Sequence, residues 1–182
     1  MSALGHVAVG VATARLLSPS GTPSDVLASR MAALSTLALL PDLDFLIPAV
    51  GPSTGPFAHR GASHSLVAAM VVGLIIAVAI KAWGGRRAIM WGIVATAVVA
   101  SHPILDLFSD TDLGVALLWP LSNARFLAPW HILPNPPWPG VFSPFGLRQL
   151  GLEVMLFFPF WIYAFFPRRL IQSPSEGRPV SK

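Results

Sequence analysis

The sequence contains no cysteine and few charged residues. The absence of any thiol among its 182 residues excludes disulfides, thiolate metal sites and cysteine nucleophiles. Only 11% of the residues are charged, whereas 54% are hydrophobic, and the mean hydropathy is +0.67. This composition is far from that of a soluble domain and predicts an integral membrane protein. Any metal ion must be held by nitrogen and oxygen ligands.

Positive charge exceeds negative charge by four, but it is not gathered into one basic segment. No cluster of lysine and arginine is interleaved with aromatic residues, so we expect no nucleic-acid partner. In a membrane protein a small positive excess is typical of loops kept in the cytoplasm. The composition therefore predicts membrane lipid as the partner of the chain.

Long apolar segments predict an all-α integral membrane bundle of about four to five helices. Two segments approach the roughly 20 residues that cross a hydrocarbon core, and the short link GGRR between them forces a hairpin. Two shorter segments are separated by the turn-rich SPSGTPSD, where Ser24 or Asp25 is expected to cap the second helix. The expected helices are residues 3–17, 26–40, 66–83, 88–107 and 150–166.

Two regions are expected to lie outside the helices. Residues 110–146 are rich in proline, tryptophan and phenylalanine, and because proline interrupts helices they predict an extracytoplasmic loop at the membrane interface. The polar residues 172–182 predict a disordered cytoplasmic tail. The expected organisation is one membrane-embedded domain over residues 1–171, followed by this tail.

The basic residues predict a multi-pass orientation in the inner, or plasma, membrane. With the GGRR link on one face, nine of the 12 basic residues fall on that side, which the positive-inside rule makes cytoplasmic. The histidine and acidic residues then gather toward the extracytoplasmic face, while the C-terminus is cytoplasmic. Ionisable groups at membrane depth are rare and typically functional, so this layer predicts a site. The three basic residues on its side are Arg60, Arg125 and Arg148.

The motif SHPILDL places His102 and Asp106 four residues apart. On a helix this spacing puts both side chains on one face, within reach of a common ion. Pro103 either disturbs a continuous helix or begins a new one capped by Ser101. The alternative to a metal site is that His102 packs in the bundle and Asp106 acts as a cap.

The motif LLPDLDF follows the second expected helix, which Pro41 should end. An extended segment would then point the carboxylates of Asp42 and Asp44 in the same direction. Carboxylates beside imidazoles suit zinc, manganese or iron better than calcium. The alternative is a solvated turn without a ligand.

The motif HRGASHSL brings two further histidines to the start of a span. Gly61 is expected to allow a tight turn, so that His59 and His64 converge, while Arg60 holds an anionic group such as a phosphate. Either Ser63 or Ser65 is expected to cap the following helix.

Three more ionisable residues have two interpretations each. His6 is either a hydrogen-bonded core histidine or a ligand. Glu153, the only acid in the last span, either pairs with Arg148 or joins the site. His131, in the proline-rich loop, is expected to be a surface residue.

Taken in order, the motifs GHVAVGVA, LLPDLDF, HRGASHSL, SHPILDLFSDTDLG and LLWPLS resemble the YdjM-like family of small inner-membrane proteins, which are predicted to be metal-dependent hydrolases. The resemblance covers most of the chain, from about Gly5 to Glu153. The family is similar, more distantly, to the zinc-dependent phospholipase C and P1 nuclease group. The helical fold of that group holds zinc ions with histidine and aspartate and cleaves phosphodiesters.

The resemblance implies one or two divalent ions, with zinc the expected metal. Glu153 fits the later His-x-x-x-Glu element of the phospholipases only loosely, because Gln149 stands four residues before it. This departure argues against a full cluster of three ions. The expected metal ligands are His6, Asp42, Asp44, His59, His64, His102, Asp106 and Glu153.

The expected activity is hydrolysis of a phosphoester or lipid-headgroup substrate by a metal-activated water. Asp42 or Asp44, if not a ligand, would be the general base, and Arg60 would orient the anion. The alternatives are an ion- or proton-coupled transporter and a non-catalytic membrane scaffold. The lack of an internal repeat argues against a transporter.

Overall fold

The computed structural model describes residues 3–46, 55–136 and 140–166. Within these ranges the chain forms helices and loops, with two isolated β-bridges and no extended sheet. The tail expected at residues 172–182 lies outside the described residues. The elements are α1 (Ala3–Leu16), α2 (Ser24–Leu39), the 3-10 helices η1 (Leu40–Leu46) and η2 (Ala62–His64), α3 (Leu66–Ala82), α4 (Ala88–Asp106), α5 (Pro144–Leu156) and α6 (Phe158–Phe165).

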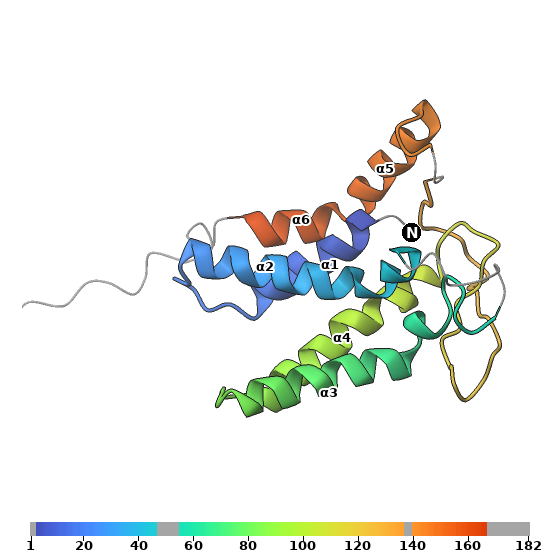
Figure 1. Ribbon diagram of the computed structural model, residues 1–182. Coiled ribbons are helices and arrows are strands. Elements are labelled where there is room, and N and C mark those ends of the chain that lie inside the picture. Colours follow the sequence, from blue (N-terminus) through green and yellow to red (C-terminus); the bar gives the residue numbers. More distant parts are fainter. Residues whose placement is uncertain (1–2, 47–54, 137–139, 167–182) are drawn as a thin grey trace, which may run out of the picture.

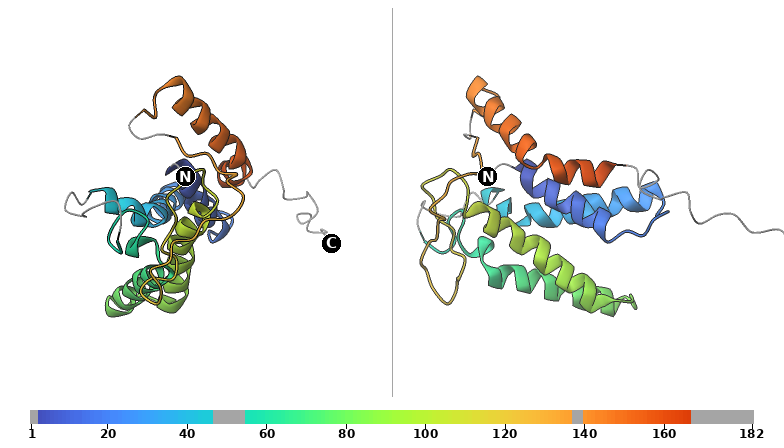
Figure 2. Two further views of the ribbon diagram at one scale, coloured as in Figure 1. Left: turned by 90° about the vertical axis from the view of Figure 1, so that its right-hand side faces the viewer. Right: turned by 180° about the vertical axis from the view of Figure 1, so that it is seen from behind.

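The first four α-helices form two hairpins that meet at one end of the molecule. α1 packs along α2, α3 packs along α4, and α4 also contacts α1 and α2 (Figure 1). α6 covers α1, whereas α5 projects away from the bundle. The start of α1, η1, η2 and the end of α4 lie together beside the long loop (Figure 2). The polar motifs thus gather at one end, and the basic GGRR link between α3 and α4 lies at the other.

The α3–α4 hairpin agrees closely with the sequence prediction. Ser65 caps α3 by accepting the N–H of Ala68 at 3.0 Å, as expected for one of the two serines. The two helices approach closely at Gly73, where a Cβ atom would overlap the Thr96 hydroxyl and lie 2.5 Å from the Gly92 carbonyl oxygen. Small residues allow such close backbone contact between membrane helices.

Two of the described helical segments are long and apolar enough to cross a membrane. They are α2 together with η1, spanning Ser24–Asp44, and α4. α5 and α6 would make a third span if the bent pair crosses as one unit, and α1 and α3 are shorter apolar helices. The fold is therefore a helical membrane bundle, as the sequence predicted.

The prediction of one continuous helix over residues 150–166 is wrong. The helix begins earlier, at Pro144, because Ser143 caps it by accepting the N–H of Gly146 at 3.1 Å. It then breaks between α5 and α6, whose axes differ by 59° (Figure 1). Pro159 lies in the first turn of α6, and its missing N–H cannot continue the hydrogen bonding of α5.

The boundaries of α2 also differ from the prediction. The residue at its N-cap is Pro23, and no side chain caps the helix, so Ser24 and Asp25 lie in its first turn instead. At the other end α2 stops at Leu39, two residues before Pro41, and tightens into η1 instead of becoming extended. The 3-10 conformation of η1 determines the directions in which the carboxylates of Asp42 and Asp44 point.

Candidate metal centre

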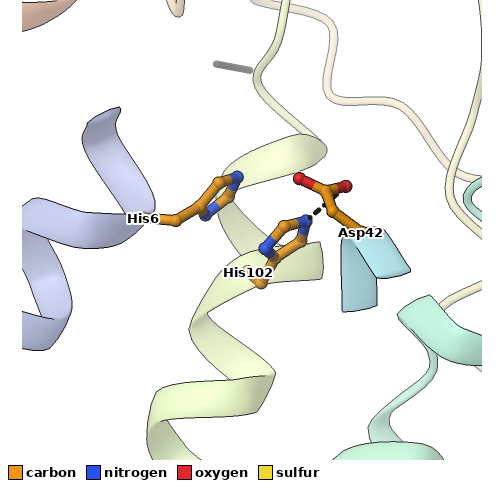
Figure 3. Close-up of side chains that lie close together, drawn as sticks. All are labelled: His6, Asp42 and His102. Atoms are coloured by element: carbon orange, nitrogen blue, oxygen red, sulfur yellow. Dashed lines mark ion pairs between the residues drawn. The ribbon is translucent and has the colours of Figure 1, made fainter. Parts of the chain in front are cut away.

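Side chains from four separate segments converge where the hairpins meet. α1 contributes His6, η1 contributes Asp42, η2 contributes His64, and α4 contributes both His102 and Asp106. Four of the five are buried, while the side chain of Asp42 is 27% exposed. Figure 3 shows His6, Asp42 and His102 lying close together from three different elements.

The candidate ligand atoms lie close enough to share an ion. Asp42 Oδ1 lies 3.2 Å from His102 Nε2 and 3.4 Å from His64 Nε2. Asp106 Oδ2 lies 3.7 Å from both of these nitrogens, and its Oδ1 lies 3.6 Å from His6 Nε2. The ring of His6 stacks on that of His102, with centroids 3.6 Å apart. Three overlapping sets have their atoms within 4.8 Å of one another: His6, Asp42 and His102; Asp42, His59 and His64; His64, His102 and Asp106.

Two of the histidines are held in a fixed orientation through Nδ1. His102 Nδ1 lies 2.7 Å from the carbonyl oxygen of Ala38, to which it donates. His64 Nδ1 lies 2.9 Å from Ser63 Oγ and 3.3 Å from Asp44 Oδ2. A proton on Nδ1 leaves the lone pair on Nε2, and histidine ligands of metals are typically held in this way.

The nitrogen atoms that face the cluster make no hydrogen bond within the described part of the chain. They are Nε2 of His64 and His102 and both ring nitrogens of His6, and all are buried. Buried polar atoms are rarely left without a partner. Burial opposes charge on His64, but its contacts with Asp42 and Asp44 outweigh this effect and raise its pKa above the ordinary value. Imidazole nitrogens and carboxylates of this kind fit a divalent cation such as zinc.

Asp42 and Asp44 point in different directions, contrary to the prediction of parallel carboxylates. Because η1 is a 3-10 helix with about three residues per turn, residues two apart do not share a face. Asp42 faces the cluster, whereas Asp44 accepts from His59 Nδ1 at 2.8 Å and from Ser63 Oγ at 2.7 Å. Asp44 also lies beside His64 Nδ1 and therefore supports the cluster from outside it.

Arg60 lies inside the protein instead of facing an open site. Its Nε lies 3.3 Å from Asp106 Oδ2, and its NH1 donates to the Leu113 carbonyl at 3.0 Å. The tight turn rests on Arg60 itself, which has a φ of 60°, and not on a left-handed Gly61. Gly61 is required for a different reason, since a Cβ atom there would meet the carbonyl oxygens of Pro56 and Ala58.

At the cluster, the side chains of Asp42 and His59 are partly exposed. His59 is 26% exposed and lies beside Asp42, and its ring meets that of His64 with centroids 5.3 Å apart. The convergence of His59 and His64 therefore agrees with the sequence prediction.

Other ionisable residues were also singled out in the sequence. Glu153 is buried and accepts the Gly5 N–H at 2.9 Å, so it lies next to the cluster but outside its three ligand sets. His131 is exposed, as predicted. α4 runs through Pro103 without a new start, which leaves His102 and Asp106 on one continuous helix.

Sequence reasoning missed several supporting contacts. Ser63 was expected only as a helix cap, and nothing predicted its hydrogen bond to Asp44. The sequence gives one indication of the Ala38 carbonyl that orients His102. Pro41 marks a helix end, and helix ends leave carbonyls without amide partners. Arg125, whose contacts are described below, belongs to no recognisable motif.

Comparison with known proteins matches nearly the whole chain to one family. The family model described as YdjM inner membrane protein matches residues 1–172. Inner membrane protein YbcI of Escherichia coli (strain K12) is 36% identical over 122 residues, which cover 65% of this chain and 70% of that relative. No solved structure matches the chain. The chain therefore belongs to the YdjM family of inner membrane proteins.

Proposed function

We propose that the protein is a membrane-bound metal-dependent hydrolase acting on a phosphoester, with a lipid headgroup as the natural substrate. One observation carries this proposal: buried imidazole nitrogens from three helical elements face two aspartates and have no hydrogen-bond partner in the described residues. Keeping such groups together in a protein of the membrane is unfavourable unless they bind something.

The residues would divide the work as follows. His64, His102, Asp42 and Asp106 would hold one or two divalent ions, with zinc the expected metal, and His6 would complete the set. When bound, the ion supplies Lewis acidity and an activated water. Asp44 would hold the histidines of the HRGASH segment in position, and Arg60 would orient Asp106 and offset its charge.

A lipid substrate is favoured by the place of the cluster in the bundle. Its ligands lie at the ends of apolar helices, beside the segment before η2 with exposed Phe57 and the long loop with exposed Leu121 and Trp130. Aromatic and apolar side chains at helix ends are typical of the membrane interface, where phosphate headgroups lie. Asp42 and His59, on the exposed side of the cluster, would meet the headgroup first.

The metal can be tested directly on protein purified in detergent. Elemental analysis of the wild type should find zinc, and His102→Ala should lose most of it because the change removes a ligand. His131→Ala is the matched control, since this exposed histidine should not affect metal content. Wild-type protein that holds no divalent metal after incubation with zinc would contradict the proposal.

Activity can be tested on vesicles of phosphatidylethanolamine and phosphatidylglycerol. Release of a phosphorylated headgroup should require zinc, stop with a chelator, and be lost in Asp42→Asn. Ion flux in proteoliposomes that Asp106→Asn abolishes, without hydrolysis, would instead favour a transporter. Full biological function of a His64→Ala variant would point to a non-catalytic scaffold.

A further inference from the structure

Arg125 lies in the long loop, outside the cluster, yet its guanidinium group makes an unusual set of contacts. NH1 donates to the carbonyl oxygens of Gly114 at 2.8 Å, His59 at 3.1 Å and Arg60 at 3.4 Å. NH2 donates to the carbonyl oxygen of Gly55 at 3.2 Å. All four acceptors are main-chain carbonyls, so the side chain ties together three segments of backbone.

We infer that Arg125 is a positioning residue for the metal centre, a role that rests on the proposed function of that site. It fixes the backbone from which two side chains reach the cluster. From this backbone His59 joins the ligand set of Asp42 and His64, and Arg60 reaches Asp106. Arg125 thus acts on the candidate ligands through other residues and touches none of the three ligand sets except through the His59 carbonyl.

The backbone at Arg60 needs support of this kind. A φ of 60° is uncommon for a residue with a long side chain and is energetically unfavourable. Two of the four carbonyls that Arg125 binds belong to Arg60 and the residue before it, and the Arg60 carbonyl also accepts the Ala116 N–H at 2.9 Å. These hydrogen bonds hold the conformation that directs Arg60 toward Asp106.

Arginine suits this position better than lysine, because its planar group carries several donors in a fixed arrangement. The local backbone also accommodates it. A Cβ atom on Gly114 would lie 2.9 Å from the Cβ of Arg125, so only glycine permits this approach. Gly114 is therefore required for the hydrogen bonds that Arg125 makes.

The test compares Arg125→Ala and Arg125→Lys with Arg148→Ala, an exposed arginine of α5, in full-length detergent-purified protein. Hydrogen exchange of residues 55–65, measured without metal, should rise about tenfold in Arg125→Ala, while exchange in α1–α4 stays unchanged. Zinc affinity should fall about 10- to 100-fold, the range for loss of a supporting contact. The exchange rate and zinc affinity of Arg125→Lys should lie between those of Arg125→Ala and wild type. Both quantities should be unchanged in Arg148→Ala.

Chemical rescue separates positioning from general support of the fold. Millimolar guanidinium should restore zinc affinity to Arg125→Ala, whereas sodium at equal ionic strength should not. Unchanged hydrogen exchange of residues 55–65 in Arg125→Ala would overturn the inference. So would a loss of exchange protection throughout the helices of Arg125→Ala and Arg125→Lys that guanidinium does not reverse. If wild-type protein binds no zinc, the proposed function fails, while the metal-free exchange still decides whether Arg125 holds the loop.

Discussion

Asp42 and Asp44 stand two residues apart but make different contacts, so their substitution should have different effects. Asp44→Asn should weaken zinc binding about 10- to 100-fold, because an amide cannot accept from all of the donors around this carboxylate. Asp42→Asn should weaken it more, since it removes a candidate ligand. Competition with a chromogenic chelator measures both affinities.

Asp112→Asn provides the control, because this aspartate is exposed in the loop. It should bind zinc as the wild type does. Equal losses in Asp42→Asn and Asp44→Asn would show that the two carboxylates share one role, contrary to the geometry of η1.

The close packing of α3 against α4 depends on the glycine at position 73. Gly73→Ala should destabilise the protein by about 1–3 kcal/mol, because the added methyl group must displace Thr96 or separate the two helices. The midpoint of thermal unfolding in detergent measures the change. Because α3 follows η2 directly, separation of the helices should also weaken zinc binding.

Gly151→Ala is the matched control in α5. A Cβ atom there has nothing within 4 Å, and alanine favours the helix over glycine by about 0.5–1 kcal/mol. It should therefore leave stability unchanged or raise it. A Gly73→Ala protein as stable as the Gly151→Ala protein would contradict the close packing of α3 and α4.

The orientation of the whole molecule is open to a direct test, because the chain has no cysteine of its own. In Ser20→Cys the thiol lies in the exposed turn between α1 and α2, and in Asn123→Cys it lies in the long loop. With the basic end cytoplasmic, an impermeant maleimide added to spheroplasts should label Asn123→Cys and not Ser20→Cys.

Permeabilised cells are the control for this labelling, since both thiols should then react. The opposite pattern in intact spheroplasts would place the candidate metal centre on the cytoplasmic side. It would also move the proposed substrate to the cytoplasmic leaflet, without changing the ligands of the centre.

The sequence alone was enough to determine the class of the protein and most of its helices. Apolar length and composition decide whether a segment prefers lipid, and α3 and α4 follow from such local properties. The pair His102 and Asp106 could also be predicted, because helical spacing places them on one face.

Only the tertiary structure decided which polar groups meet and which of them face the cluster. The approach of His6, His64 and His102 depends on packing between helices remote in sequence, and Arg125 reaches the HRGASH segment across more than sixty residues. The different roles of Asp42 and Asp44 depend on a tightening of η1 that no local pattern indicated. Spacing along one helix is a local property, whereas contacts between helices are selected by the free energy of the whole bundle.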